Sequence, residues 1–154
     1  TGANVVTALR DGVNKMDEDE VPFEDRHLFI TPTLYGLVQD LDTTKSKEVL
    51  SRFASVTLVP QTRFYTAITQ YDGTTASQTA GGYIKDASNG MDINFMIIHK
   101  PAVIQYEKHV VPKIITPDQN QTADAYKFGY RNVGIADVYD NKVSGIYLHH
   151  KAKG

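Results

Sequence analysis

The sequence predicts an α+β domain, because helix-length and strand-length segments follow one another without the regular alternation of a parallel α/β fold. Near the start of the chain apolar residues recur at helical spacing, and after it they gather in short runs of strand length. The composition is that of a globular protein, with 41% hydrophobic and 22% charged residues. At 154 residues, we expect a single compact unit over residues 1–154.

The first expected element is a helix with one apolar stripe. The stripe repeats at three- and four-residue spacing and consists of Val6, Leu9, Val13 and Met16. Asn4 is the expected N-cap, since its side-chain oxygen can accept a bond from a free backbone N–H. The helix should end at the acidic run 17–20, where the helix dipole disfavours negative charge, and Pro22 reinforces this end.

Two strands and a short helix are expected next. Residues 27–30 form an apolar run typical of a buried strand. Thr31 and Pro32 then supply an N-cap and a first helical residue for a short helix. The polar stretch 42–47 is expected to be a turn or loop. Residues 56–59 alternate like a strand, which the following proline ends.

The middle of the chain predicts an exposed long loop over residues 66–91. It is rich in Thr, Ser, Ala, Gly and Asp, and Gly81-Gly82 and Asn89-Gly90 are turn signals. A small hairpin around 83–85 is expected within it. Long loops inside compact domains often carry interactions, and a plain surface excursion is an equally open interpretation.

The last third predicts mainly strands. Residues 93–98 give the strongest strand pattern in the sequence. The elements expected after it are a helical turn at 101–104, a kinked extended segment at 110–115, a strand at 126–130, a stretch at 133–139 that either continues this strand or pairs with it again, a turn at 140–142 and a last strand at 143–148. Tyr126, Phe128 and Tyr130 would lie on one face of their strand, either as the inner face of a sheet or as anchors of an interface.

No pattern of residues predicts catalysis, a cofactor or a metal ion. The adjacent His149 and His150 would point to opposite faces of a strand, and no carboxylate stands at metal-ligand spacing from His99 or His109. The acids at 17–20 lack the alternating ligands and the glycine of a calcium loop. Nucleophile-elbow, Walker and dinucleotide-binding motifs are absent. We therefore expect no enzyme, and no catalytic, cofactor-binding or metal-ligating residues.

The composition argues against further classes of protein. The formal charge of −2 and the pI near 6.2 argue against a dedicated nucleic-acid binder. The chain has no cysteine, which excludes disulfides and thiolate chemistry. No apolar run approaches the roughly 20 residues of a membrane helix, so no membrane partner is expected.

Four sequence blocks carry a resemblance to a known family. The first is the junction Arg26-His27-Leu28-Phe29-Ile30-Thr31-Pro32, which follows an Ala/Leu helix and Val21-Pro22. The others, in order, are Ile93–Val103, Lys108–Ile114 with Asn120–Arg131, and Lys142–His149. In this order the blocks resemble the C-terminal half of the major capsid proteins of tailed phages and prophages, of the Hong Kong 97 phage type. Residues 66–91 match that family least.

The resemblance implies a truncated capsid fold, with the axial domain and part of the peripheral domain built on a mixed sheet with short flanking helices. The family's N-terminal arm and extended loop are not recognisable in this sequence, so a monomeric state of the chain alone is compatible with the resemblance, and its oligomeric state is left open. The loop 66–91 would lie near the capsomer axis. The lysine-bearing crosslinking loop of some relatives is likewise not recognisable.

The function implied is that of a structural subunit of an icosahedral phage or prophage capsid, which self-associates into hexamers and pentamers that enclose DNA. Its partners would be copies of itself, scaffold or other capsid proteins, and packaged DNA without sequence specificity. It would be located in the virion capsid, and in the bacterial host cytoplasm during assembly. The alternative is a small-ligand or peptide-binding α+β module, with the loop 66–91 as a lid.

Overall fold

The computed structural model describes residues 1–152 and has an α+β architecture with a mixed sheet, as the sequence predicts. The contacts divide the chain into two units, where the sequence predicts one. The first unit consists of Thr1–Ala102 and the chain from Asn141 onward, and the second is Val103–Asp140. Each unit is described by itself.

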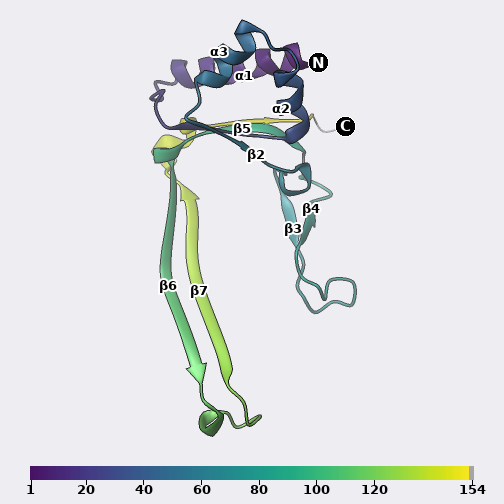
Figure 1. Cartoon of the computed structure of the whole chain (residues 1–154), viewed down its shortest axis with the longest axis vertical. Helices are drawn as coiled ribbons and strands as arrows, with labels where there is room; N and C mark the ends of the chain where they lie inside the picture. Colours follow the sequence, from purple (N-terminus) through teal and green to yellow (C-terminus); the bar gives the residue numbers. More distant parts are fainter. Residues whose placement is uncertain (153–154) are drawn as a thin grey trace. The chain divides into compact units, whose positions relative to one another are not determined.

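The first unit is built on a four-stranded sheet in the order β2-β1-β5-β8. Figure 1 shows α1 and α3 on one side of this sheet. Strands β1 and β2 pair in parallel, whereas β5 pairs antiparallel with both β1 and β8, which makes the sheet mixed. The helices and strands of this unit are α1 (Gly2–Glu18), β1 (Arg26–Ile30), α2 (Pro32–Gln39), α3 (Thr44–Ser51), β2 (Ser55–Leu58), β3 (Ile68–Gln70), β4 (Tyr83–Lys85), β5 (Ile93–His99) and β8 (Ile146–His150).

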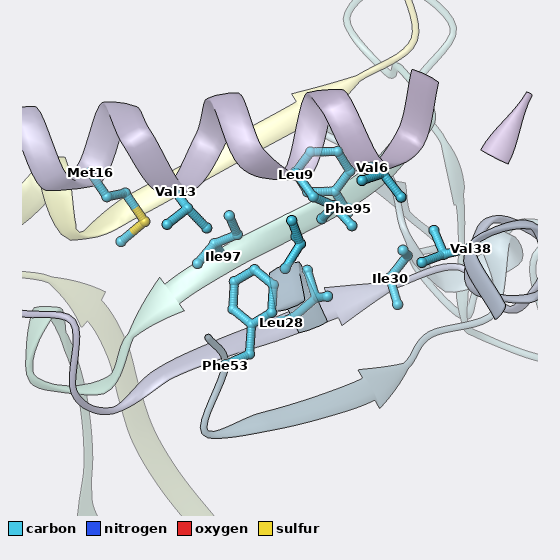
Figure 2. Packing of buried hydrophobic residues seen from close by; sticks show 11 residues of the cluster. Val6, Leu9, Val13, Met16, Leu28, Ile30, Val38, Phe53, Phe95 and Ile97 are labelled. Carbon is cyan, nitrogen blue, oxygen red and sulfur yellow. The ribbon is translucent and has the colours of Figure 1, made fainter. Parts of the chain in front are cut away.

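The core lies between α1 and one face of this sheet (Figure 2). The predicted stripe of α1 is confirmed, and all four of its residues are buried. They pack against the inward residues of the two central strands, namely Leu28, Ile30, Phe95 and Ile97. Burial of each such side chain stabilises the fold by about 1.5–3 kcal/mol. The burial pattern of β1 alternates, so a five-residue strand supplies three inward positions.

The start of α1 differs from the prediction. The helix begins at Gly2 with Thr1 as its N-cap, so the assignment of Asn4 as the cap is wrong. The backbone N–H of Asn4 donates to the Thr1 carbonyl at 3.2 Å, which places Asn4 inside the first turn. The predicted end is confirmed, since the helix stops at Glu18 within the acidic run.

The Arg26 guanidinium joins the end of α1 to the first strand. Arg26 is only 2% exposed. The guanidinium donates to the Pro22 carbonyl at 2.9 Å and to the Val21 carbonyl, and it forms an ion pair with Asp17 at 2.7 Å. A buried cation is tolerated because it is paired and its donors are occupied. This contact fixes the path of the chain from the helix to the sheet.

A short helix replaces the loop predicted at 42–47. Helix α3 starts at Thr44 because Thr43 and Ser46 form a capping box: each side-chain oxygen accepts from the other residue's backbone N–H at 3.2 Å. Val49 of this helix is buried in the core. The prediction failed because it weighed polarity and missed the reciprocal cap.

The last strand starts later than predicted, whereas the hairpin expected around 83–85 is present. The last strand begins at Ile146 and not at Val143, which belongs to the 3-10 segment Asp140–Gly145. Within residues 66–91, β3 and β4 form a short antiparallel hairpin, and all six strand residues are exposed. Asp72 lies between these strands; hydrogen bonds from the Thr75 hydroxyl and from the backbone N–H groups of Thr75 and Thr74 lower its pKa to about 2.

The second unit is a two-stranded antiparallel ribbon. Strand β6 (Val103–Ile115) pairs along its length with β7 (Lys127–Val138). Lys108 is an extra residue in β6, where the register shifts between Glu107 and His109. Of the two possibilities left open for residues 133–139, the structure shows that they continue the strand predicted at 126–130, and the expected kinked segment at 110–115 lies inside β6.

Substitutions at two helical glycines, one in α1 and one in α2 as a control, test the packing of α1 against the sheet. A Cβ at Gly12 would lie 2.8 Å from the Tyr147 ring and 3.1 Å from Ile97, whereas a Cβ at Gly36 in α2 would meet nothing within 4 Å. We expect Gly12→Ala to lower the free energy of unfolding by about 1–3 kcal/mol through overpacking. Gly36→Ala should raise it by up to about 1 kcal/mol through helix propensity. Urea unfolding measures both; equal effects of the two changes would contradict the packing described.

Candidate interaction surface on the β6–β7 ribbon

The ribbon exposes an unusual number of large apolar side chains. Every residue of β6 up to Ile114 and of β7 up to Asp137 is exposed. The large apolar residues exposed in this unit are Val103, Ile104, Tyr106, Val110, Val111, Ile114, Tyr126, Phe128, Tyr130, Val133, Ile135 and Tyr139. An apolar surface of this extent is typical of a binding site for another protein.

The register assigns these side chains to two faces, since residues paired across an antiparallel ribbon point the same way and alternate along each strand. In the distal half one face, here called the aromatic face, carries Val110, Pro112, Ile114, Phe128 and Tyr130. The other, here called the basic face, carries Val111, Lys113, Ile115, Lys127, Gly129, Arg131 and Val133. The ribbon therefore presents two chemically different surfaces.

The aromatic face continues beyond the strand to Tyr126. Its ring stacks with that of Phe128, with centroids 6.4 Å apart. Tyr126, Phe128 and Tyr130 are 62%, 74% and 71% exposed. Of the two interpretations that the sequence leaves open, this exposure favours interface anchors over the inner face of a packed sheet.

The basic face holds cations without acidic partners. Within residues 1–152, Lys113, Lys127 and Arg131 form no ion pair. The whole unit is nevertheless not basic, because its four Lys and Arg residues are accompanied by five Asp and Glu residues. The positive charge is thus concentrated on one face of the ribbon, and the unit as a whole has no excess of positive charge.

The histidines do not come together. His149 stacks on Phe95 with centroids 4.8 Å apart, and its ring nitrogen lies 3.1 Å from the Asn94 amide nitrogen. His150 is exposed, and its neighbouring position in the strand puts it on the opposite face. In the part of the chain that the structure describes, no three His, Asp or Glu side chains are grouped as metal ligands.

The acids at 17–20 lie at the end of α1, as expected, and two of them are paired. Asp17 contacts Arg26 and Arg52, and Asp19 contacts Lys15 at 2.9 Å. Sequence reasoning missed Phe23, which lies three residues after this run. Phe23 is 74% exposed, and the signal that could have found it is a lone aromatic residue within an acidic run.

The comparisons with known proteins give no family: no family model matches the chain, and neither does any curated protein. Among residues 1–152, no helix has the length and hydropathy needed to span a bilayer.

The ribbon should be the least protected regular structure in the chain. A two-stranded ribbon without a covering layer is marginally stable in water, whereas β1 and β5 are central strands of a covered sheet. In dilute solution we expect amide hydrogens of β6 and β7 to exchange much faster than those of β1 and β5. Hydrogen–deuterium exchange with mass spectrometry measures this. Equal protection of ribbon and sheet would contradict it.

His149 should make stability depend on pH. Burial is the main cause that lowers the pKa of His149, and the charge of His150 adds to it. The folded state therefore favours neutral His149, so this contribution is complete above the unfolded pKa of about 6.5 and is lost as the pH falls through the lowered folded pKa. Between about pH 7.5 and about pH 5, the loss of unfolding free energy should be smaller in His149→Gln than in the unsubstituted chain. His150→Gln is the control and should keep most of the loss, because burial of His149, the larger cause, is unchanged; an unchanged loss in His149→Gln would refute the assignment.

Proposed function

We propose that this chain is a structural subunit that associates with copies of itself, as part of an icosahedral phage or prophage capsid built from hexamers and pentamers around DNA. The observation that carries the proposal is the ribbon, whose apolar side chains are exposed on both faces. Such a surface loses its contact with water only when another protein covers it.

The blocks that carry the resemblance to capsid proteins support the proposal. They correspond to β1 with the start of α2, to β5, to much of the ribbon, and to β8. The blocks therefore include three of the four strands of the sheet and most of the surface that we assign to association. A shell subunit needs both parts, a stable body and repeated contact surfaces, and it needs no catalytic group.

The proposed partners follow from the same role. Copies of this chain would meet in capsomers, and scaffold or other capsid proteins would meet the assembled subunits. Packaged DNA would be contacted without sequence specificity. The proposed locations are the virion capsid and, during assembly, the cytoplasm of the bacterial host.

Electron microscopy of the gene product that contains this chain tests the proposal. Expressed in a bacterium, it should form closed shells or rings. Phe128→Ser with Tyr130→Ser should abolish these particles, because both side chains are exposed anchors, and it should leave the folding of the first unit intact by circular dichroism. Val143→Ser with Leu58→Ser is the matched control, since both residues are exposed apolar side chains outside the ribbon. A gene product that stays monomeric with its phage partners present would overturn the capsid proposal, and a ligand search would follow.

A further inference from the structure

The first unit carries an acidic surface that complements the basic face of the ribbon. This surface, here called the acidic segment, is Asp17–Asp25, which links α1 to β1. All of its residues except Val21 are exposed. At its centre lies Phe23, which at 74% is as exposed as Phe128 of the ribbon. Aromatic residues are enriched at protein interfaces, so an aromatic ring that is exposed among carboxylates favours a contact surface over an ordinary solvated turn.

Four carboxylates of the acidic segment form no ion pair among residues 1–152, namely Glu18, Glu20, Glu24 and Asp25. The segment is also fixed in place: Arg26 holds the carbonyls of Val21 and Pro22. A partner that docks on a prefixed segment loses less conformational entropy than one that orders a loop.

The basic face offers a matching slot. Lys113 pairs with Gly129 across the ribbon, and Lys127 and Arg131 lie on the same face on either side of Gly129. A Cβ at Gly129 would lie no closer than 3.8 Å to any other atom, so the space above the glycine is open. An aromatic ring placed there would contact bare backbone and would have three cations around it, which is favourable for both packing and cation–π attraction.

A nucleic acid fits these observations less well. The ribbon unit has more acids than bases, and its exposed surface is largely aliphatic and aromatic. Moreover, the three cations without ion pairs are matched by carboxylates without ion pairs that the same chain carries, so both halves of the contact are present whenever two copies meet.

We propose that the basic face of the ribbon docks on the acidic segment of a second copy, with Phe23 over Gly129 and the free carboxylates against Lys113, Lys127 and Arg131. This inference rests on the proposed self-association and names one of its contacts. The contact is heterologous, because it joins two different surfaces of identical chains, so each docked copy keeps one free ribbon or one free segment. Repetition of such a contact builds a ring where the rotation between copies closes, and an open filament where it does not.

Charge reversal tests the contact. Lys127→Glu with Arg131→Glu reverses the ribbon, and Glu20→Lys with Glu24→Lys reverses the segment. Each variant alone should associate about tenfold more weakly than the unsubstituted chain, since attraction becomes repulsion. An equal mixture of the two variants should recover the association, and so should one chain that carries all four changes. Sedimentation velocity over a concentration series, up to the solubility limit and at low and high salt, measures this.

Two further variants address the ring and the slot without any change of charge. Phe23→Ser and Gly129→Val should each weaken association, and neither should unfold the chain, because Phe23 is exposed and Gly129 has room for a side chain. Lys45→Glu with Lys151→Glu is the charge-matched control for the ribbon variant and should associate normally, since both residues are exposed and lie outside both surfaces.

Carbodiimide coupling between light and nitrogen-15-labelled chains locates the contact. We expect amide crosslinks from Lys113 or Lys127 of one chain to Glu20 or Glu24 of another. Crosslinks only within one chain, or variants that associate as well as the unsubstituted chain, would overturn the docking and leave the proposed self-association standing. The docking also fails if the unsubstituted chain shows neither association nor light–heavy crosslinks; the microscopy then decides the proposed function separately. Binding of a labelled DNA duplex that only the ribbon reversal abolishes, with association unaffected, would assign the cations to nucleic acid instead.

Discussion

The buried Arg26 guanidinium is the contact on which the first unit and its acidic segment both depend. It pairs with Asp17 at the end of α1 and takes the carbonyls of Val21 and Pro22, so the chain leaves the helix and enters β1 along one fixed path. An arginine buried in this way stabilises the fold only while its donors are satisfied. The same bonds that satisfy it hold the backbone next to Phe23. The same interaction thus fixes the connection between α1 and β1 beside the core and holds the backbone that carries the exposed Phe23 ring.

The two units use apolar residues in opposite ways. In the first, one face of the sheet and one stripe of α1 bury each other, and the exposed remainder is mixed. In the second, two long strands satisfy each other's backbone hydrogen bonds but leave their side chains without a second layer. Folding of the ribbon is therefore supported mainly by its ladder, and much of the free energy available from its apolar side chains is left for association. That division is what a subunit needs if it must fold first and assemble later.

The sequence predicted the parts whose residues interact locally or at a regular period. The stripe of α1 and the alternation in β1 and β5 follow from burial of one face, and both were found. Helix α3 was missed because its start depends on a reciprocal bond between Thr43 and Ser46, which polarity alone conceals. The candidate interaction surface was predicted only in part. Alternation put Tyr126, Phe128 and Tyr130 on one face. Whether that face is covered depends on contacts between distant segments, which cannot be inferred from a single sequence.

The chemistry of the ribbon constrains how copies could meet. If only the aromatic face bound another copy, two ribbons could cover each other symmetrically, and association would stop at a symmetric dimer. The opposite face changes this outcome, because its cations repel a second basic face and are attracted to carboxylates such as those of the acidic segment. A symmetric pair joined through its aromatic faces would leave these cations unmatched, whereas docking on a different surface matches them. In the proposed self-association, the alternation of Lys127, Gly129 and Arg131 with Phe128 and Tyr130 therefore favours an extending contact over a simple symmetric dimer.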